Sequence, residues 1–176
     1  MIEDELSIRP GGPADAPAVA ALHAESWRTA YAGIVPPAVL GDGLAAQRAE
    51  LWELRLEADY GEPAAQPVLL LAESGDGDLL GFGYLVPQPD GRVLLDNLHV
   101  RPGRTGAGLG GALLGALRAE TARSHPGAPL YLEVLADNHR AIAFYERAGG
   151  HRTDSRTTHF PGAGELPEYE YTWTQP

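Results

Sequence analysis

Cysteine is absent from this sequence of 176 residues. A chain without cysteine forms no disulfide, offers no thiolate to a metal ion and has no thiol nucleophile. Its six histidines are scattered, and no two of them have the H-x-x-x-H spacing that places two metal ligands on one helix face. We therefore expect a protein that uses no metal.

Lysine is absent too, so all 13 basic residues are arginine, against 24 acidic residues and a net charge of −11. This balance argues against a nucleic-acid groove, which needs clustered basic side chains, and mildly favours cationic partners. The phosphate-binding pattern G-x-x-x-x-G-K-[ST] requires a lysine and is excluded. The nucleophile pattern G-x-S-x-G does not occur either.

Long hydrophobic runs are also missing, because no stretch approaches the roughly 20 apolar residues that a membrane-spanning helix needs. The first residues, MIEDELSIRP, are acidic and contain no hydrophobic core of a signal peptide. We expect a cytoplasmic protein whose partners include neither a membrane nor nucleic acid.

The apolar periodicity and the positions of glycine and proline predict a single α+β domain over residues 1–176. The predicted elements are a strand at 6–10, helices at 13–31 and 44–60, strands at 68–73, 79–86 and 93–100, a helix at 109–125, a strand at 130–135, a helix at 138–147, and strands near 151–159 and 169–173. In the second helix the predicted inward residues are Leu44, Leu51, Leu54 and Ala58, and the predicted outward ones are Arg48, Glu53 and Glu57.

A run of glycines separates the third strand of the central meander from the next helix. The segment reads RPGRTGAGLGG, and four of the six residues from 106 to 111 are glycine. Each glycine costs conformational entropy on folding, so this density indicates a ligand that needs bare backbone. A helix N-terminus offers unpaired N–H groups and a positive dipole end, which together favour a phosphate. The alternative is a turn with packing roles alone.

A dinucleotide-binding fingerprint, G-x-G-x-x-G, occurs literally at Gly106, Gly108 and Gly111, and an acidic residue, Glu133, follows in the next predicted strand. In that fold the glycines follow the strand almost at once, whereas here residues 101–105 intervene. The rest of the chain is also too short for the remaining βαβ units. A nicotinamide-dependent oxidoreductase is therefore only a distant alternative.

Two longer motifs carry a family resemblance. Residues 100–110 read V-x-P-x-x-x-G-x-G-x-G, and residues 132–150 read LEVLADNHRAIAFYERAGG. In this order, with an apolar helix between them, they resemble the acetyl-CoA loop and the following strand and helix of the GNAT (Gcn5-related N-acetyltransferase) superfamily. The resemblance covers most of the chain and is strongest over 93–150.

The resemblance implies a mixed, mostly antiparallel sheet of six or seven strands flanked by helices. It implies an N-acetyltransferase that moves an acetyl group from acetyl-CoA to a primary amine by direct transfer in a ternary complex. The absence of cysteine, which removes the usual thiol acyl-enzyme route, agrees with direct transfer. The alternative is a non-catalytic acyl-CoA-binding regulator on the same fold.

The resemblance also implies which residues hold acetyl-CoA. They are the main chain of Leu98, His99 and Val100 along the pantetheine, Arg104, Thr105, Gly106, Ala107, Gly108, Leu109, Gly110 and Gly111 around the pyrophosphate, and Asn138 and Tyr145 beyond them. The family's loop usually has Gln or Arg where this chain has Thr105, so Thr105 offers a hydroxyl and Arg104 would supply the charge. Asn138 has an alternative role as a helix N-cap.

Catalysis needs a proton for the leaving thiolate, and Tyr145 is the predicted donor. A CoA thiol has a pKa of about 8 to 9 by analogy with cysteine, and a free tyrosine has one near 10, so the transfer has no large mismatch. The alternative for Tyr145 is a half-buried core residue. A backbone N–H of residues 98–100 would meet the developing oxyanion.

The general base has three candidate side chains, Asp96, His99 and Glu133, besides a chain of waters or an acceptor that is already neutral. Asp96 and His99 fall on opposite faces of a regular strand, unless a bulge changes the alternation. We rank Asp96 slightly first, because of its position in the strand that leads to the glycine run.

The acceptor is expected to be a small-molecule or peptide amine, and the residues leave polyamines, amino acids, antibiotics and peptide N-termini open. Trp27 and Tyr31 are predicted to form a wall of its pocket, although aromatic residues at helical spacing are more often core residues. Glu25 is a weaker candidate for a contact with a cationic amine. Members of the family are often dimers, so a homodimer is one expected form.

Overall fold

The computed structural model describes residues 5–104 and 108–176. Seven strands form one sheet in the order β1-β2-β3-β4-β5-β7-β6. The strands are β1 (Ser7–Pro10), β2 (Val68–Glu73), β3 (Leu79–Pro87), β4 (Val93–Val100), β5 (Leu130–Leu135), β6 (His151–Phe160) and β7 (Gly164–Trp173). The helices are α1 (Ala16–Ala30), α2 (Leu44–Glu57), α3 (Leu109–Ser124) and α4 (His139–Arg147), with short 3₁₀ turns before and between them. The predicted α+β fold is confirmed.

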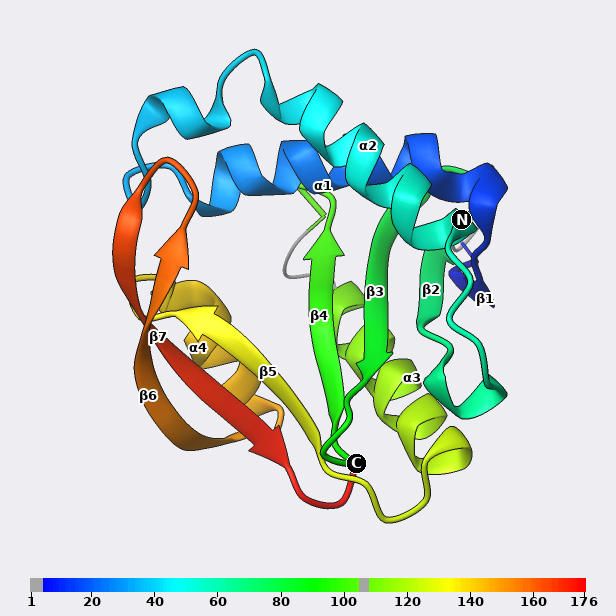
Figure 1. The fold of residues 1–176 in the computed structure, drawn as a ribbon. Coiled ribbons are helices and arrows are strands. Elements are labelled where there is room, and N and C mark those ends of the chain that lie inside the picture. The colour runs from blue at the N-terminus through cyan, green and yellow to red at the C-terminus, as the bar shows by residue number, and fades with distance from the viewer. Residues whose placement is uncertain (1–4, 105–107) are drawn as a thin grey trace.

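The sheet consists of two antiparallel parts joined by one parallel pair. Strands β1 to β4 form one part, and β5, β7 and β6 form the other. Strands β4 and β5 run parallel where the two parts meet. Helices α1 and α2 cover one face of the first part, and α3 and α4 lie on the opposite face (Figure 1). No helix of the described residues lies on the α1–α2 side of the second part (Figure 1).

Each covered face has its own apolar core. The core under α1 and α2 includes Val19, Leu22, Trp52, Leu71 and Phe82. The core under α3 and α4 includes Leu95, Leu113, Leu117, Leu132 and Trp173. Gly83 lets α3 approach the sheet closely, because a Cβ atom at this position would overlap the side chain of Leu117. No helix in the described part of the chain is long and apolar enough to cross a membrane.

The inward face of α2 differs from the prediction. Leu54 is 68% exposed, whereas Trp52 is fully buried. The helix turns Leu44, Arg48, Trp52 and Arg55 towards the sheet and α1, and these positions follow one helical stripe. The stripe was missed because two of its members are arginines, whose long side chains can cross an apolar layer while the charged head stays near water.

The last strand is longer than predicted. Strand β7 begins at Gly164, and the segment expected as a loop pairs with β6 as far as Gly164 opposite Phe160. The pairing of β5 with β7 ends at Leu135 opposite Glu168. Pro167 lies one residue beyond this pair, where β6 is the only strand that pairs with β7, and a proline is tolerated at such a position. The β6–β7 hairpin therefore extends past the sheet towards the end of α1 (Figure 1).

Candidate functional site

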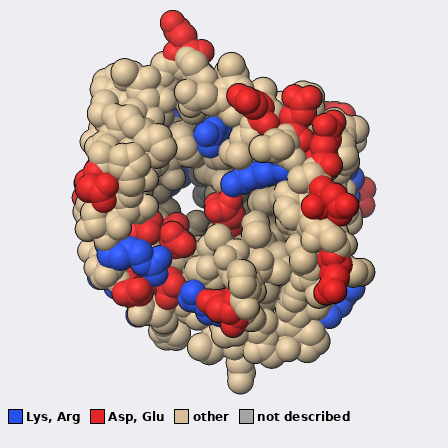
Figure 2. Space-filling model, in the orientation of Figure 1, with Lys and Arg blue, Asp and Glu red and all other residues tan. Residues whose placement is uncertain are grey.

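The functional site is centred on a separation between two neighbouring strands. Strands β4 and β5 pair only at Val93–Leu130 and Leu94–Tyr131, and beyond these pairs they diverge (Figure 1). Figure 2 shows that this face of the molecule is hollowed at its centre, between the α1–α2 layer and the second part of the sheet. The divergence exposes the edge of β4 to a ligand.

A β-bulge in β4 sets which side chains face this space. Tyr84 of β3 lies opposite Asn97, and the next residue, Leu85, lies opposite Leu95, so Asp96 is the extra residue. The alternation of faces shifts at that point. As a result, the side chains of Asp96 and His99 both reach residues of the α1–α2 layer. The bulge thus brings together two candidates that a regular strand would separate.

The same ladder fixes where the backbone amides of β4 point. The N–H of Arg101 donates to the carbonyl of Leu80 on β3 at 2.7 Å. Because N–H groups alternate along a strand, the amide of His99 also points to β3, and those of Leu98 and Val100 point to the gap before β5. Of the three residues predicted to line the pantetheine, two therefore offer their amides to a ligand and His99 offers its amide to the sheet.

The N-terminus of α3 forms a second open backbone surface. Gly108 caps the helix with φ of +79°, a conformation that favours glycine, and no side chain of the described residues caps the helix. The first amides of α3, from Leu109 to Gly111, therefore have no side-chain acceptor within residues 5–104 and 108–176. A Cβ atom added at Gly111 would meet nothing within 4 Å. This cradle fits an anionic group such as a pyrophosphate.

Four of the predicted loop residues lie at the edge of this cradle or outside the described part. Arg104 is exposed, and its N–H donates to the carbonyl of Arg101 at 3.0 Å. Thr105, Gly106 and Ala107 lie outside the described residues. The cradle is thus defined by the residues from Gly108 onwards.

Helix α4 supplies two of the predicted residues. The side chain of Asn138 accepts a hydrogen bond from the N–H of Ala141 at 3.3 Å, so its N-cap role is confirmed. Its Oδ1 is thereby used, and Nδ2 has no hydrogen-bond partner in the described part of the chain. Tyr145 is half-buried beside Phe144 and Trp173, and its hydroxyl has no hydrogen-bond partner among the described residues. Burial, and then the charge of Tyr31, raises the pKa of Tyr145 well above its usual value.

His99 lies in a network that the sequence analysis did not foresee. Its Nδ1 is 2.7 Å from the hydroxyl of Ser26, and its ring packs on His23, with centroids 4.7 Å apart. Burial, and then the charge of Arg48, lowers the pKa of His99 to about 4, so the ring is neutral at pH 7. The signal for this network is the i, i+3 spacing of His23 and Ser26, which places them on one face of α1.

His23 itself is buried and bound to α2. The indole Nε1 of Trp52 donates to Nδ1 of His23 at 2.9 Å, which requires that nitrogen to be unprotonated. Burial, followed by the charge of His99, lowers the pKa of His23 to about 2. This histidine is therefore a neutral structural support beneath His99.

The other two candidates for the base are carboxylates in ion pairs. Asp96 accepts from Arg55 at 2.6 Å, and Arg55 also donates to Asn97 at 2.8 Å. Glu133 lies 3.7 Å from Arg156, on the side of β5 that no helix covers. Glu168 of β7 lies 3.7 Å from the same arginine. Burial, and then the charge of Glu133, raises the pKa of Glu168 to about 7.

The aromatic wall is built by two distant segments. Trp27 and Tyr31 of the α1 end have centroids 5.3 Å apart, and Phe160 of the β6–β7 hairpin lies 5.3 Å from the first and 5.7 Å from the second. Arg48 stacks over Trp27, at 4.4 Å from the ring centroid. These residues connect the hairpin to the C-terminal end of α1. Glu25 is exposed on the outer side of α1.

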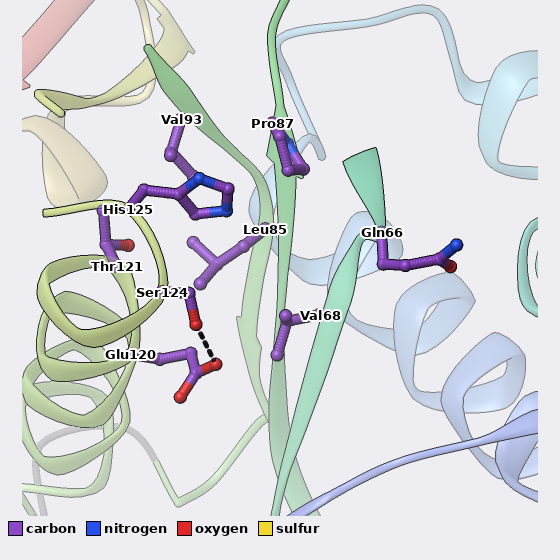
Figure 3. Close-up of a pocket in the computed structure, with 9 residues that line it drawn as sticks. All are labelled: Gln66, Val68, Leu85, Pro87, Val93, Glu120, Thr121, Ser124 and His125. Atoms are coloured by element: carbon purple, nitrogen blue, oxygen red, sulfur yellow. Dashed lines mark hydrogen bonds between the residues drawn. The ribbon is translucent and has the colours of Figure 1, made fainter. Parts of the chain in front are cut away.

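A small pocket elsewhere does not belong to this site. It lies between the C-terminal end of α3 and strands β2 to β4 (Figure 3). Glu120, Ser124 and His125 line one side, and the first two share a hydrogen bond of 2.7 Å. The space has room for about one water molecule at most. It is at the opposite end of α3 from the glycine cradle.

A sequence model of the acetyltransferase (GNAT) family matches residues 24–150. The chain belongs to this family. The probable N-acetyltransferase Rv2775 of Mycobacterium tuberculosis is 33% identical over 89% of this chain and 86% of its own length. The mycothiol acetyltransferase of Streptomyces avermitilis is 37% identical over 61% of this chain, which spans 36% of that protein. The spermine/spermidine N(1)-acetyltransferase of Bacillus subtilis is 36% identical over 42% of this chain and 53% of that protein.

Solved structures agree on the fold. A putative GNAT acetyltransferase from Desulfovibrio desulfuricans superposes with a TM-score of 0.72 at 24% identity, covering 98% of this chain and all of the other. The PaiA N-acetyltransferase of Thermoplasma acidophilum, in complex with coenzyme A, has a TM-score of 0.67 at 22% identity, covering 95% of this chain and 99% of the other. The predicted family, the fold and the class of acetyl-CoA-dependent acyltransferase are confirmed.

Proposed function

We propose that this protein transfers an acetyl group from acetyl-CoA directly to a primary amine while both substrates are bound. The observation that carries the proposal is the open edge of β4, where the amides of Leu98 and Val100 point into the gap before β5. An extended pantetheine arm placed there receives the hydrogen bonds that a neighbouring strand would otherwise make. The glycine cradle begins α3, the next helix of the chain after this strand, and meets the pyrophosphate.

Acetyl-CoA supplies the thioester, and the chain's own groups orient it. Nδ2 of Asn138 is available to donate to the pantetheine, since Oδ1 is used by the helix cap. The amide of Leu98 or Val100 donates to the thioester oxygen and stabilises the negative charge that develops during attack. Such a preorganised donor contributes about 3 to 4 kcal/mol to catalysis where it has been removed in other enzymes.

Tyr145 donates a proton to the departing thiolate. Its raised pKa means that the phenol carries its proton at every pH at which the enzyme works. Its hydroxyl forms no hydrogen bond with a described residue, so it is available to the sulfur. The family resemblance, more than the spacing of the residue, assigns this role to Tyr145.

The proton of the attacking amine goes to His99 or to water held by His99. The ring is neutral, half-buried and fixed by Ser26. A pKa of about 4 makes direct removal of a proton from an ammonium unfavourable, so we expect the amine to enter mainly in its neutral form or to lose its proton through water. Asp96, which we ranked first from the sequence, is held by Arg55 and gives up an ion pair if it takes a proton.

The first experiment is a thermal-shift titration with acetyl-CoA, CoA, NAD⁺ and NADPH in parallel. A ligand that binds only the native state stabilises it by RT ln(1 + [L]/Kd), about 2.7 kcal/mol at a hundredfold excess over Kd. The proposal requires a shift with the CoA ligands and none with the nicotinamide ligands. CoA release is then measured with a broad panel of small amines and peptides. Binding of acetyl-CoA without turnover of any amine would favour the regulator.

A further inference from the structure

Arg48 of α2 is a half-buried guanidinium with no partner of opposite charge in the part of the chain that the structure describes. Its Nε is buried and has no hydrogen-bond partner, and the described residues form no ion pair with it. Arg55, two turns further along the same stripe, is bound to Asp96 and Asn97. The two arginines thus differ, because one is neutralised within the protein and the other is not.

An unpaired buried cation is unfavourable, because the desolvation of the charge is not compensated by hydrogen bonds. Burial lowers the pKa of Arg48 accordingly, and the neighbouring charge of Arg55 acts in the same direction. Stacking on Trp27 offsets part of this cost. The terminal Nη atoms are not among the buried atoms without a partner, so the outer edge of the guanidinium remains accessible to a bidentate acceptor.

Arg48 lies close to the groups proposed for catalysis. Its charge acts on Tyr31, His23 and His99, and the charge of Tyr31 acts in turn on Tyr145. In Figure 2, arginine side chains lie at the edge of the hollow beneath α1 and α2, and carboxylates gather across it over the second part of the sheet. Strands β5 and β7 carry Glu133, Glu168 and Glu170, and Arg156 of β6 lies within 3.7 Å of each of them.

We propose that Arg48 binds a carboxylate of the acceptor, so that the protein acetylates amino acids or other amines that also carry a carboxylate. This assignment rests on the proposed N-acetyltransferase function. A single unpaired guanidinium matches a single negative charge. A phosphate, with about two charges, would need further unpaired donors. Fixing one end of the acceptor in this way positions its amine for attack.

The test compares matched pairs of acceptors, each an amino acid and its own carboxamide, with rates expressed per concentration of neutral amine because the amine of the carboxamide has the lower pKa. Wild type should use the carboxylate member with a kcat/KM at least about tenfold higher, as expected for a charged hydrogen-bonded contact. Arg48→Gln should lose this preference through a rise in KM for the carboxylate member, while any effect of the lost charge on His99 changes kcat for both members alike. Arg48→Lys should restore part of it, since a lysine keeps the charge but lacks the planar fork. Arg123→Gln, an exposed arginine paired with Glu120 on α3, is the control and should behave as wild type.

A binding measurement separates this inference from the proposed function. In the presence of CoA, which cannot donate an acetyl group, the carboxylate acceptor should raise the thermal midpoint of wild type and not that of Arg48→Gln. Equal use of acids and amides by wild type overturns the inference while leaving the acetyltransferase function intact. Equal loss of both in a folded Arg48→Gln also overturns it. If wild type turns over no amine in the panel, the proposed function fails and this inference fails with it.

Discussion

The hydroxyl of Ser26 lies 2.7 Å from Nδ1 of His99, and this hydrogen bond joins α1 to β4 at the bulged strand that borders the hollow. The imidazole is thereby held between the helix and His23, whose own ring is fixed by Trp52. Both histidines are neutral at pH 7 because their surroundings disfavour the charged form. A polar network of this kind has consequences for stability as well as for catalysis.

The first prediction concerns stability in acid. The pKa of each histidine is lower in the folded state than the ordinary value of about 6.5, so the unfolded chain binds more protons below that pH. Their contribution to the unfolding free energy is therefore complete above pH 6.5 and falls as the pH drops towards 4. The slope is up to about 1.4 kcal/mol per pH unit for each histidine. Urea unfolding at a series of pH values should show this slope, and His99→Gln should reduce it; an unchanged slope contradicts the assignment.

The contribution of Glu168 to the unfolding free energy should depend on pH in the opposite direction. Its pKa is raised to about 7, so the folded state holds a proton that the unfolded chain releases near pH 4.5. Its favourable contribution is complete below pH 4.5 and is lost as the pH rises through 7. Glu168→Gln, which keeps the neutral form at all pH values, should raise the unfolding free energy at pH 8 by about 1 to 3 kcal/mol relative to wild type.

The control for Glu168 is the same comparison at pH 4, where wild type already carries the proton. At that pH the unfolding free energies of the variant and of wild type should differ little. Destabilisation by Glu168→Gln at pH 8 would mean that the ionised carboxylate is satisfied by Arg156, which lies 3.7 Å away, more fully than its burial indicates.

Variants of Asp96 and His99 test which of the two side chains accepts the proton of the amine. If the carboxylate serves mainly to hold Arg55, then Asp96→Asn should leave kcat within about threefold of wild type and cost less than about 1 kcal/mol of stability, as for a partly exposed ion pair. His99→Gln should lower kcat by about a hundredfold, in the range typical for loss of a general acid or base. The two variants are compared at saturating acetyl-CoA over pH 6 to 9. A large loss in Asp96→Asn together with normal activity in His99→Gln would restore our ranking from the sequence.

The order of elements and the strand-to-helix loop could be predicted from the sequence, because turns at Gly and Pro and the periodicity of apolar residues are local signals. The glycine run carried a family motif in addition. Asp96 was identified as a candidate, but the bulge at Asp96 was foreseen only as an alternative. A bulge depends on the register with β3, which no local pattern in β4 records.

The side chains of α2 were harder to predict. Leu54 was expected to be inward and is exposed, and Arg48 was expected to be outward and lies over Trp27. Hydrophobicity alone assigns arginine to the surface, yet a guanidinium that stacks on an indole can occupy an inward position. The network of Ser26, His23 and His99 was missed for a related reason, since its members lie 73 residues or more apart across α1 and β4.

Tyr145→Phe should separate catalysis from binding. The substitution keeps the ring that packs beside Phe144 and Trp173 and removes a hydroxyl that has no partner among the described residues, so stability should change by less than about 1 kcal/mol. Affinity for acetyl-CoA should remain close to wild type, while kcat should fall by about a hundredfold or more. Steady-state rates and a thermal-shift titration with acetyl-CoA measure the two quantities. A variant with unchanged kcat would assign Tyr145 to the core alone.

A substitution at Gly111 tests the pyrophosphate cradle, because it should raise stability and at the same time lower the affinity for acetyl-CoA. Space is open around its position in the first turn of α3, so Gly111→Glu fits without a clash. A helix gains about 1 kcal/mol from replacing glycine, and a carboxylate near the N-terminus adds about 0.3 to 1 kcal/mol. The same negative charge repels a pyrophosphate at these amides. The variant should therefore be more stable than wild type and yet bind acetyl-CoA at least about tenfold more weakly.

Gly115 provides the matched control, because it is also an exposed glycine of α3 with open space around it, one turn further from the N-terminus. Gly115→Glu should be more stable than wild type, because glutamate has a higher helix propensity than glycine. It should keep the wild-type affinity for acetyl-CoA, since the field of the helix end falls off within the first turn. Thermal unfolding without ligand gives the stabilities, and titration with acetyl-CoA at low and high salt gives the affinities. The repulsion of the pyrophosphate in Gly111→Glu should weaken at high salt, because salt screens the interaction between the two charges. If both variants bind acetyl-CoA equally well, the phosphates do not lie at the start of α3, and the open edge of β4 would have to hold the donor without the cradle.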